Sequence, residues 1–136
     1  PDHTPHAGGE LIPYFGVPLL TSNLSAKLIQ KTKACALLLY AIRNEDHGFD
    51  MYIEPIDEKI YQGNANDGSI VIFEAIEKLI QRYPEHYHWS YKRFKANPQL
   101  RNLYNVSDEE VEKRVHNVRE QYERERMNQT CEQNLS

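Results

Sequence analysis

The sequence is poor in the features that most often mark a redox, membrane or nucleic-acid-binding protein. It has two cysteines, Cys35 and Cys131, whose separation matches no common metal or redox spacing. Cys35 lies in an apolar run, which predicts a buried thiol. No uninterrupted apolar run reaches the roughly 18 residues of a membrane span, so none is predicted in this chain. The net charge of −4 gives no basic field and argues against a nucleic-acid partner.

Motifs for metals, nucleotides and serine hydrolases are also lacking. His86 and His88 would diverge on a helix, and no third ligand follows at a useful spacing. The sequence contains no Gly-x-Ser-x-Gly elbow, P-loop or Gly-x-Gly-x-x-Gly fingerprint. We therefore expect no metal and no bound organic cofactor.

The first third of the chain alternates turn residues with short apolar segments. Residues 1–10 are loop-like, 11–15 form a short strand that Pro13 keeps from a central position, and 16–18 turn the chain. A helix then begins at Thr21 or Ser22. Its periodicity predicts that the following side chains face inward: Leu24, Leu28 and Ile29.

A strand, its return strand and a helix are predicted next. Residues 34–42 carry no charge, which predicts a strand buried on both faces. Residues 49–56 return antiparallel to it as a hairpin. An amphipathic helix begins at Asp67 or Ser69 and ends before Pro84.

Aromatic and basic residues are concentrated in residues 84–95, which hold the only tryptophan. As a helix, this segment places Glu85, Trp89 and Arg93 on one ridge. Trp89 then packs in the core and the cations are solvated. Alternatively, the ring and the guanidinium form an apolar wall with a positive edge for a phosphate-bearing or acyl substrate.

The order of elements predicts an α/β fold with helices packed on a mixed, mostly parallel sheet. We divide the chain into a domain over residues 1–106 and a charged helical tail over 107–136, helical to about residue 126 and disordered at its end. Three strands make a small sheet, so further strands are expected upstream. Because the chain begins with Pro1 rather than methionine, we expect it to be a fragment.

Several segments, taken in order, resemble the lipid A biosynthesis lauroyl/myristoyl acyltransferases. The segments cover residues 1–95, and those that carry the resemblance are Pro1-Asp2-His3, Pro13-Tyr14-Phe15-Gly16, Ile53-Glu54-Pro55 and Pro84-Glu85…Trp89…Lys92-Arg93-Phe94-Lys95. The resemblance implies a glycerolipid acyltransferase-like fold. It also implies an enzyme that moves a fatty acyl chain from an acyl carrier protein thioester to a hydroxyl of a lipid A precursor. That family works at the cytoplasmic face of the bacterial inner membrane.

One family motif is absent. In the superfamily a His-x-x-x-x-Asp/Glu pair deprotonates the acceptor hydroxyl, and none of the six histidines has an acidic residue five positions on. The chain thus resembles the carboxy-terminal half of the enzyme, with no catalytic residue of its own. Its partners would include the missing amino-terminal half or a second copy, which would pair with the open edge of the 34–42 strand.

The resemblance also implies candidate substrate contacts. Asp2 and His3 match the loop at the acceptor site, although His3 replaces the family's glutamine. Lys92 and Arg93 suit a phosphate of the acceptor or of the carrier protein's prosthetic arm. Arg93 alternatively pairs with Glu85 or Glu54 and holds the fold; Trp89 and Glu85 are expected to be structural.

A second interpretation is a binding module without catalysis. In it, a small α/β scaffold uses the basic-aromatic helix to dock a protein partner or an anionic membrane surface. The charged tail favours this alternative.

Overall fold

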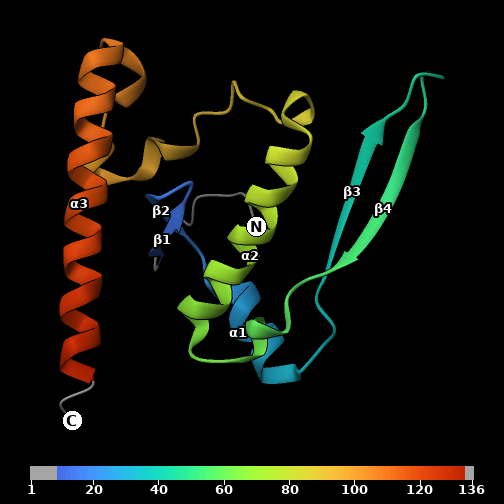
Figure 1. The fold of residues 1–136 in the computed structure, drawn as a ribbon, viewed down its shortest axis with the longest axis horizontal. Helices are drawn as coiled ribbons and strands as arrows, with labels where there is room; N and C mark the ends of the chain where they lie inside the picture. The colour runs from blue at the N-terminus through green and yellow to red at the C-terminus, as the bar shows by residue number, and fades with distance from the viewer. Residues whose placement is uncertain (1–8, 134–136) are drawn as a thin grey trace.

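The computed structural model describes residues 9–133, apart from the side chains of Ala96 and residues 129–133. In chain order its main elements are β1 (Glu10–Tyr14), β2 (Val17–Thr21), α1 (Leu24–Thr32), β3 (Leu37–Arg43), β4 (Phe49–Pro55), α2 (Ala65–Arg82) and α3 (Asp108–Gln133). Figure 1 shows α2 in the middle, α3 and the β1–β2 hairpin on one side, and the β3–β4 hairpin on the other.

Helix α2 is the central element. The Asn64 side chain accepts hydrogen bonds from the amides of Asn66 and Asp67, and the Asp67 carboxylate accepts one from the Asn64 amide. This capping box starts the helix before the predicted Asp67 or Ser69. Its apolar stripe, with Phe73 and Ile80 buried, packs against β1 and α1, as the sequence periodicity predicts.

The β1–β2 hairpin contains a strand that the sequence analysis missed. Residues 17 and 18 were expected to turn the chain, but Val17 pairs with Tyr14 and Pro18 lies opposite Pro13. Two facing prolines are tolerated because Tyr14 and Val17 form the hydrogen-bonded pair that closes the two-residue loop, and pairs alternate along an antiparallel ladder. The Pro13–Pro18 pair is therefore non-hydrogen-bonded, and neither missing N–H is needed. The outward Pro18 carbonyl accepts a bond of 2.6 Å from the buried Asn97 amide.

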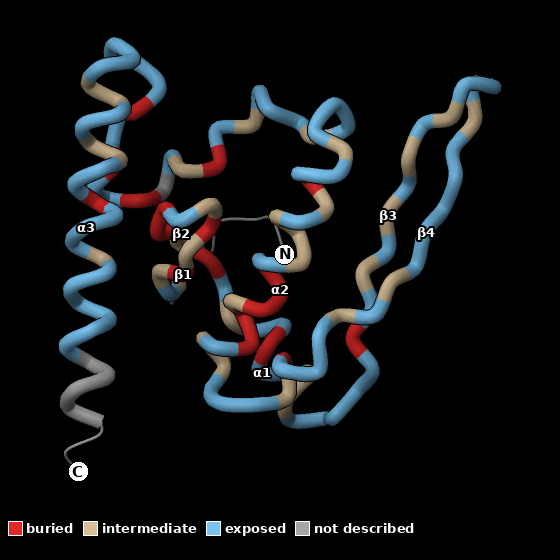
Figure 2. Tube along the Cα trace, in the orientation of Figure 1, coloured by how far each residue is buried: buried red, intermediate tan, exposed pale blue. Residues whose placement is uncertain are grey.

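Among the described residues, the core consists of three clusters that lie along α2 and the β1–β2 hairpin (Figure 2). The third joins Val118 of α3 to Val17 of β2, together with Leu100 and Leu103. The Tyr122 hydroxyl also donates a hydrogen bond of 3.3 Å to the carbonyl of Leu11. Helix α3 is therefore packed on the hairpin rather than projecting from it.

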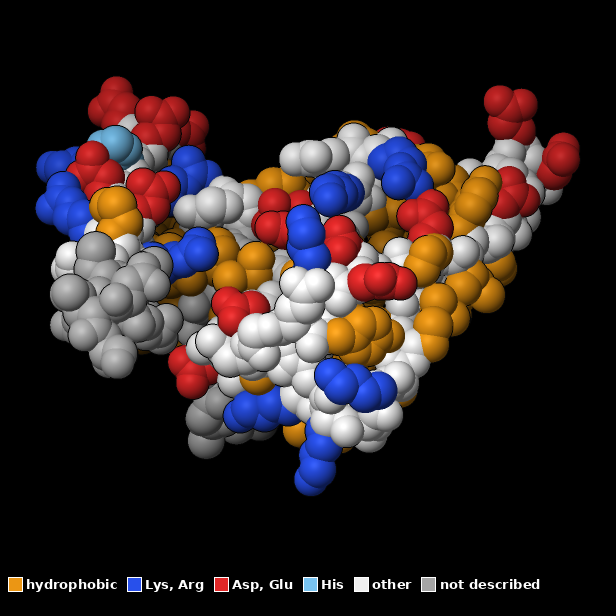
Figure 3. Space-filling model, turned by 60° about the horizontal axis from the view of Figure 1, so that its bottom comes forward, with side chains coloured by type: hydrophobic (Ala, Val, Ile, Leu, Met, Phe, Trp, Pro, Cys, Tyr) orange, Lys and Arg blue, Asp and Glu red, His pale blue; other side chains and the backbone are white. Residues whose placement is uncertain are grey.

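The β3–β4 hairpin forms as predicted, but its strands are not buried. Leu39 pairs with Ile53 and Ala41 with Met51, so all four lie on one face. Leu39 is 61% exposed and Ile53 is 66% exposed. Figure 3 shows hydrophobic side chains gathered along this hairpin. The prediction of a strand buried on both faces is wrong, because residues 9–133 supply no layer over this face.

Two further burial predictions are wrong. Leu24 and Leu28 of α1 are exposed, while Ala26 is fully buried. A methyl group at Gly68 would lie 3.2 Å from the Ala26 side chain, so α1 approaches α2 through its small residues and its leucines face away. Cys35 is exposed as well.

The predicted fold class is confirmed in its coarse form. The chain is mixed α/β with a helical tail, and α3 extends past residue 126 to Gln133. Both sheets within residues 9–133 are two-stranded and antiparallel, so these residues form no parallel sheet. The expected disorder at the end of the tail is therefore not seen as far as Gln133, and residues 134–136 lie outside the described residues. The domain boundary after residue 106 stays a prediction.

Candidate functional site

The segment that follows α2 is not the predicted helix. Short 3-10 turns at Pro84–His86 and Arg93–Ala96 flank an irregular stretch. Both ends of the segment reach Tyr14: the Tyr87 hydroxyl lies 3.3 Å from the Tyr14 hydroxyl, and the Phe94 ring centroid is 6.2 Å from that of Tyr14. These contacts prevail over the weak helix propensity of the intervening His, Tyr, Trp and Ser residues.

Trp89 is exposed, and the prediction that it is buried in the core is wrong. Its side chain has 64% of its surface accessible. The indole N–H donates a hydrogen bond of 2.7 Å to the Pro84 carbonyl, and the ring meets Tyr87 edge-on at 4.9 Å between centroids. The ring is thus held in place by its neighbours while most of its surface stays exposed to solvent.

The predicted cations lie in different settings. Arg93 is only 3% exposed, and its guanidinium lies 6.0 Å from the centroid of the Phe73 ring. Lys92 is exposed, with its ammonium 5.6 Å from the Tyr104 ring centroid. Glu54 and Glu85, the carboxylates proposed for Arg93, interact with Arg82 and His86 respectively.

The other predicted contacts cannot be placed. Asp2 and His3 lie outside the described residues, and their contact with the acceptor stays a prediction. Within residues 9–133, no group of three or more His, Cys, Asp or Glu is arranged to hold a metal ion. Helices long and apolar enough to cross a bilayer are likewise not found in that range.

The two-residue turn between β1 and β2 has an unusual backbone. Phe15 and Gly16 both have positive φ, 48° and 71°, as a type I′ turn requires. A bulky residue seldom adopts this conformation, and here two helices hold it. Glu77 of α2 accepts a bond of 2.7 Å from the Phe15 amide, and Arg119 of α3 donates one of 2.8 Å to the Phe15 carbonyl.

A half-open pocket of about 370 Å³ lies beside this turn. Its volume falls in the range of about 300–1,000 Å³ typical of small-molecule sites. The lining is mainly aromatic and aliphatic, with two guanidinium groups: Tyr14, Phe15, Val17, Tyr87, Trp89, Tyr91, Arg93, Phe94, Leu103, Tyr104 and Arg119. The pocket therefore brings together two of the predicted residues, Trp89 and Arg93, whereas Glu85 does not line it.

A separate polar cluster fixes the β3–β4 hairpin to the end of α2. The Tyr40 hydroxyl donates a bond of 2.6 Å to Glu54, and Arg82 donates one of 2.7 Å to the same carboxylate oxygen. The bond from Tyr40, followed by that from Arg82, lowers the pKa of Glu54. The hydrogen bond to Glu54 raises the pKa of Tyr40 to about 12. Glu54 thus anchors the hairpin.

Sequence reasoning missed the pocket's carboxy-terminal wall and the Glu54 cluster. Tyr104 and Arg119 follow no motif, because only tertiary packing brings α3 to the β1–β2 turn. Glu54 was noted as part of Ile53-Glu54-Pro55, and Arg82 stands in the last turn of α2, but their sequence separation gave no sign of the ion pair.

The chain belongs to the bacterial lipid A biosynthesis acyltransferases. Residues 1–96, which include β1, both hairpins, α2 and the basic-aromatic segment, match this family. The resemblance inferred from the sequence is therefore confirmed. The 97–133 segment, with the outer wall of the pocket, lies beyond the matched range.

Two curated relatives are similar over 93 residues at 32% identity. They are the lipid A biosynthesis palmitoleoyltransferase of Escherichia coli (strain K12) and a lipid A biosynthesis acyltransferase of Shigella flexneri. In each case the similarity covers 67% of this chain and 30% of the relative. The matched part of the chain thus spans less than a third of the length of these relatives.

Proposed function

We propose that this chain is the carboxy-terminal part of an acyltransferase of lipid A biosynthesis. The parent enzyme moves a fatty acyl chain from an acyl carrier protein thioester to a hydroxyl of a lipid A precursor, at the cytoplasmic face of the bacterial inner membrane. Family membership over residues 1–96 carries the proposal. No cofactor is needed, because the phosphopantetheine arm belongs to the carrier protein.

The chemistry divides between this chain and the rest of the parent enzyme. Acyl transfer needs a base to deprotonate the acceptor hydroxyl, and an imidazole oriented by a carboxylate supplies it. No histidine of this chain has an acidic residue five positions on, so that base lies elsewhere. Asp2 and His3 contact the acceptor, and Lys92 neutralises a phosphate together with Arg93. Trp89 and Glu85 serve the structure of their segment.

The β3–β4 hairpin is the site at which we expect the rest of the enzyme to join. Its apolar face, with Leu39 and Ile53, is exposed in this chain. In the parent enzyme the amino-terminal half covers this face and extends the hairpin into a mostly parallel sheet. Without that half, a second copy of this chain can pair with the open edge of β3.

An acyl-transfer assay tests this division. The 136-residue chain is incubated with acyl carrier protein thioester and lipid A precursor, beside a longer protein that adds a His-x-x-x-x-Asp/Glu motif. We expect the chain alone to leave the thioester intact and the longer protein to acylate the precursor. Turnover by the chain alone above buffer would show that the catalytic base lies within it.

A second candidate function is docking on an anionic membrane surface through the basic-aromatic segment. The exposure of Trp89 favours it, and Lys92 and Lys95 lie over the rings of Tyr104 and Tyr91. Amphipathic rings with nearby cations are typical of membrane interfaces. Liposome flotation of the chain and of Trp89→Ala tests this function. Binding to anionic but not neutral vesicles, lost in the variant, supports it, and equal flotation of the two proteins excludes it.

A further inference from the structure

The pocket beside the Phe15–Gly16 turn has two walls that come from different parts of the chain. One wall, with Tyr14 and Trp89, belongs to the residues that match the family. The other, with Tyr104 and Arg119, belongs to the carboxy-terminal segment beyond that match. Because Val118 is buried in the cluster that joins α3 to β2, this second wall is firmly placed. The pocket is therefore completed by a segment that the family match does not include.

The chemistry of the lining fits an apolar chain better than a sugar. Its described residues are aromatic or aliphatic apart from two arginines, and none carries a carboxylate. A sugar would bury many hydroxyl groups against polar groups that are mostly engaged already: the Tyr14 and Tyr87 hydroxyls bond each other, and the Tyr104 hydroxyl accepts from the Phe94 amide. Burial of a hydrocarbon chain is favourable by about 0.8 kcal/mol of transfer free energy for each methylene group. The lining thus selects for an acyl or alkyl group.

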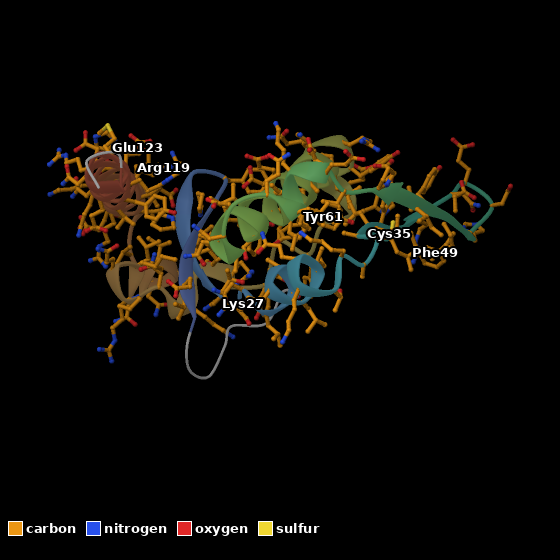
Figure 4. All side chains as sticks on the ribbon, turned by 90° about the horizontal axis from the view of Figure 1, so that it is seen from below. Lys27, Cys35, Phe49, Tyr61, Arg119 and Glu123 are labelled. Atoms are coloured by element: carbon orange, nitrogen blue, oxygen red, sulfur yellow. The ribbon has the colours of Figure 1, made fainter. Side chains whose placement is uncertain are left out.

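Arg119 supplies a positive charge at this pocket. Figure 4 shows it on α3, at the opposite end of the molecule from Phe49. One guanidinium nitrogen donates to the Phe15 carbonyl. In α3, Glu110 pairs with Arg114, and Glu120 pairs with His116 and Arg124. Among the described residues, Arg119 takes part in none of these ion pairs. Its charge is available to the polar end of a ligand.

We propose that this pocket binds one fatty acyl chain, with the hydrocarbon against the aromatic lining and the polar end of the acyl group toward Arg119. The inference rests on the proposed function for its substrate class. It adds a place for the chain and a role for the carboxy-terminal segment, which closes the pocket over the acyl group.

Trp89 is the only tryptophan and lines the pocket, so its fluorescence reports occupancy directly. The 136-residue chain is titrated with monomeric 12-bromododecanoate, whose bromine quenches a tryptophan on contact. We expect saturable quenching that unbrominated dodecanoate reverses. Quenching that rises linearly, or that dodecanoate does not reverse, would show collisional contact only and overturn the proposal.

Paired variants distinguish binding in the pocket from nonspecific binding of dodecanoate elsewhere on the surface. Tyr91→Ala should weaken dodecanoate binding about tenfold, the equivalent of about 1.4 kcal/mol, because it removes an aromatic ring that lines the pocket. Tyr91→Phe keeps the ring and should bind normally. Tyr52→Ala, on the exposed hairpin outside the pocket, is the matched control. Circular dichroism checks that each variant folds. Equal losses in Tyr91→Ala and Tyr52→Ala would overturn the proposal.

Arg119→Ala tests the orientation of the acyl group. We expect about fivefold weaker binding of dodecanoate, the scale of one solvent-exposed charge contact, and unchanged binding of dodecanol. Because Arg119 also holds the Phe15 carbonyl, a loss shared by both ligands would mean a distorted pocket and would overturn the assigned orientation.

The outcome can be distinguished from failure of the proposed function. A longer protein that transfers acyl groups, and whose Tyr91→Ala variant keeps its kcat and KM, would retain the function and overturn the pocket. A longer protein that binds dodecanoate in the pocket but transfers no acyl group would retain the pocket and overturn the function.

Discussion

The two antiparallel hairpins of this protein lie in opposite environments. The β1–β2 hairpin is covered by α2, by α3 and by the segment around Asn97, and Leu19 within it is wholly buried. The β3–β4 hairpin exposes an apolar face and is tied to α2 mainly through Glu54. An isolated two-stranded hairpin is marginal in water. The contrast indicates that β3–β4 is built for a cover that residues 9–133 do not supply.

Truncating one leucine in each hairpin gives the largest expected difference. Leu19→Ala should lower the free energy of unfolding by about 2–5 kcal/mol, because it leaves a cavity in the core. Leu39→Ala removes an exposed side chain and should change it by about 0.5 kcal/mol or less. Urea denaturation followed by circular dichroism measures both. Equal effects would contradict the contrast between the hairpins.

The exposed face should also govern self-association. We expect the chain to run as a dimer in gel filtration, or to carry a co-purifying chain visible by intact mass. The double variant Leu39→Lys/Ile53→Glu places opposite charges on a facing pair, so pairing within the hairpin is kept while the apolar face is interrupted. It should weaken the dimer at least about tenfold, the equivalent of 1.4 kcal/mol.

The control for self-association is Leu28→Lys, an exposed leucine on α1 away from the hairpin, which should leave the elution volume unchanged. A chain that is monodisperse and monomeric, with no bound partner, would show that this face needs no cover.

The polar anchor of the β3–β4 hairpin gives the smallest effect. Glu54→Gln should bring the pKa of Tyr40 down from about 12 toward its ordinary value near 10, because the charged acceptor is removed. Tyrosine ring resonances followed by NMR through alkaline pH measure this change. Glu110→Gln, which removes a comparable carboxylate on α3, should leave the Tyr40 titration as it is.

The same anchor has a predictable pH dependence. The folded-state pKa of Glu54 is depressed, so its stabilising contribution is present above the ordinary glutamate pKa and is lost as pH falls through the folded value. Tyr40 has a raised pKa, so its contribution is present below about pH 10 and is lost as pH rises through about 12. Amide hydrogen exchange in β3 and β4 measures this contribution as a function of pH. Equal protection of these amides at low and neutral pH would exclude this role for Glu54.

The sequence predicted elements with strong periodicity and missed features set by tertiary contacts. The α2 stripe and the pairing of residues 37–43 with 49–55 followed from local patterns. Strand β2 was missed because it contains Pro18. A proline is compatible with a strand only where its N–H would not face the partner strand, and the sequence alone does not show that. Burial of Leu39 and Trp89 was inferred from composition, but it depends on what else is present to pack against them.

The candidate site was predictable only in part. Trp89 and Arg93 were named from the basic-aromatic segment, and both line the pocket. Arg119 could not be found from its own neighbourhood, because it reaches the site through the packing of α3 on β2. The positive φ of Phe15 had no local signal either, since Gly, Asn and Asp are the residues that usually mark such positions in a turn.

Hydrogen exchange in β3–β4 tests most directly whether this hairpin awaits the rest of an acyltransferase. The amides of residues 37–55 are followed in the 136-residue chain, diluted until monomeric, and in a longer protein that supplies the remaining length of the relatives. We predict rapid exchange in the monomeric chain, with α2 protected, and slow exchange of both in the longer protein. Hairpin amides as protected as α2 in the monomer, or unprotected in both proteins, would contradict the account.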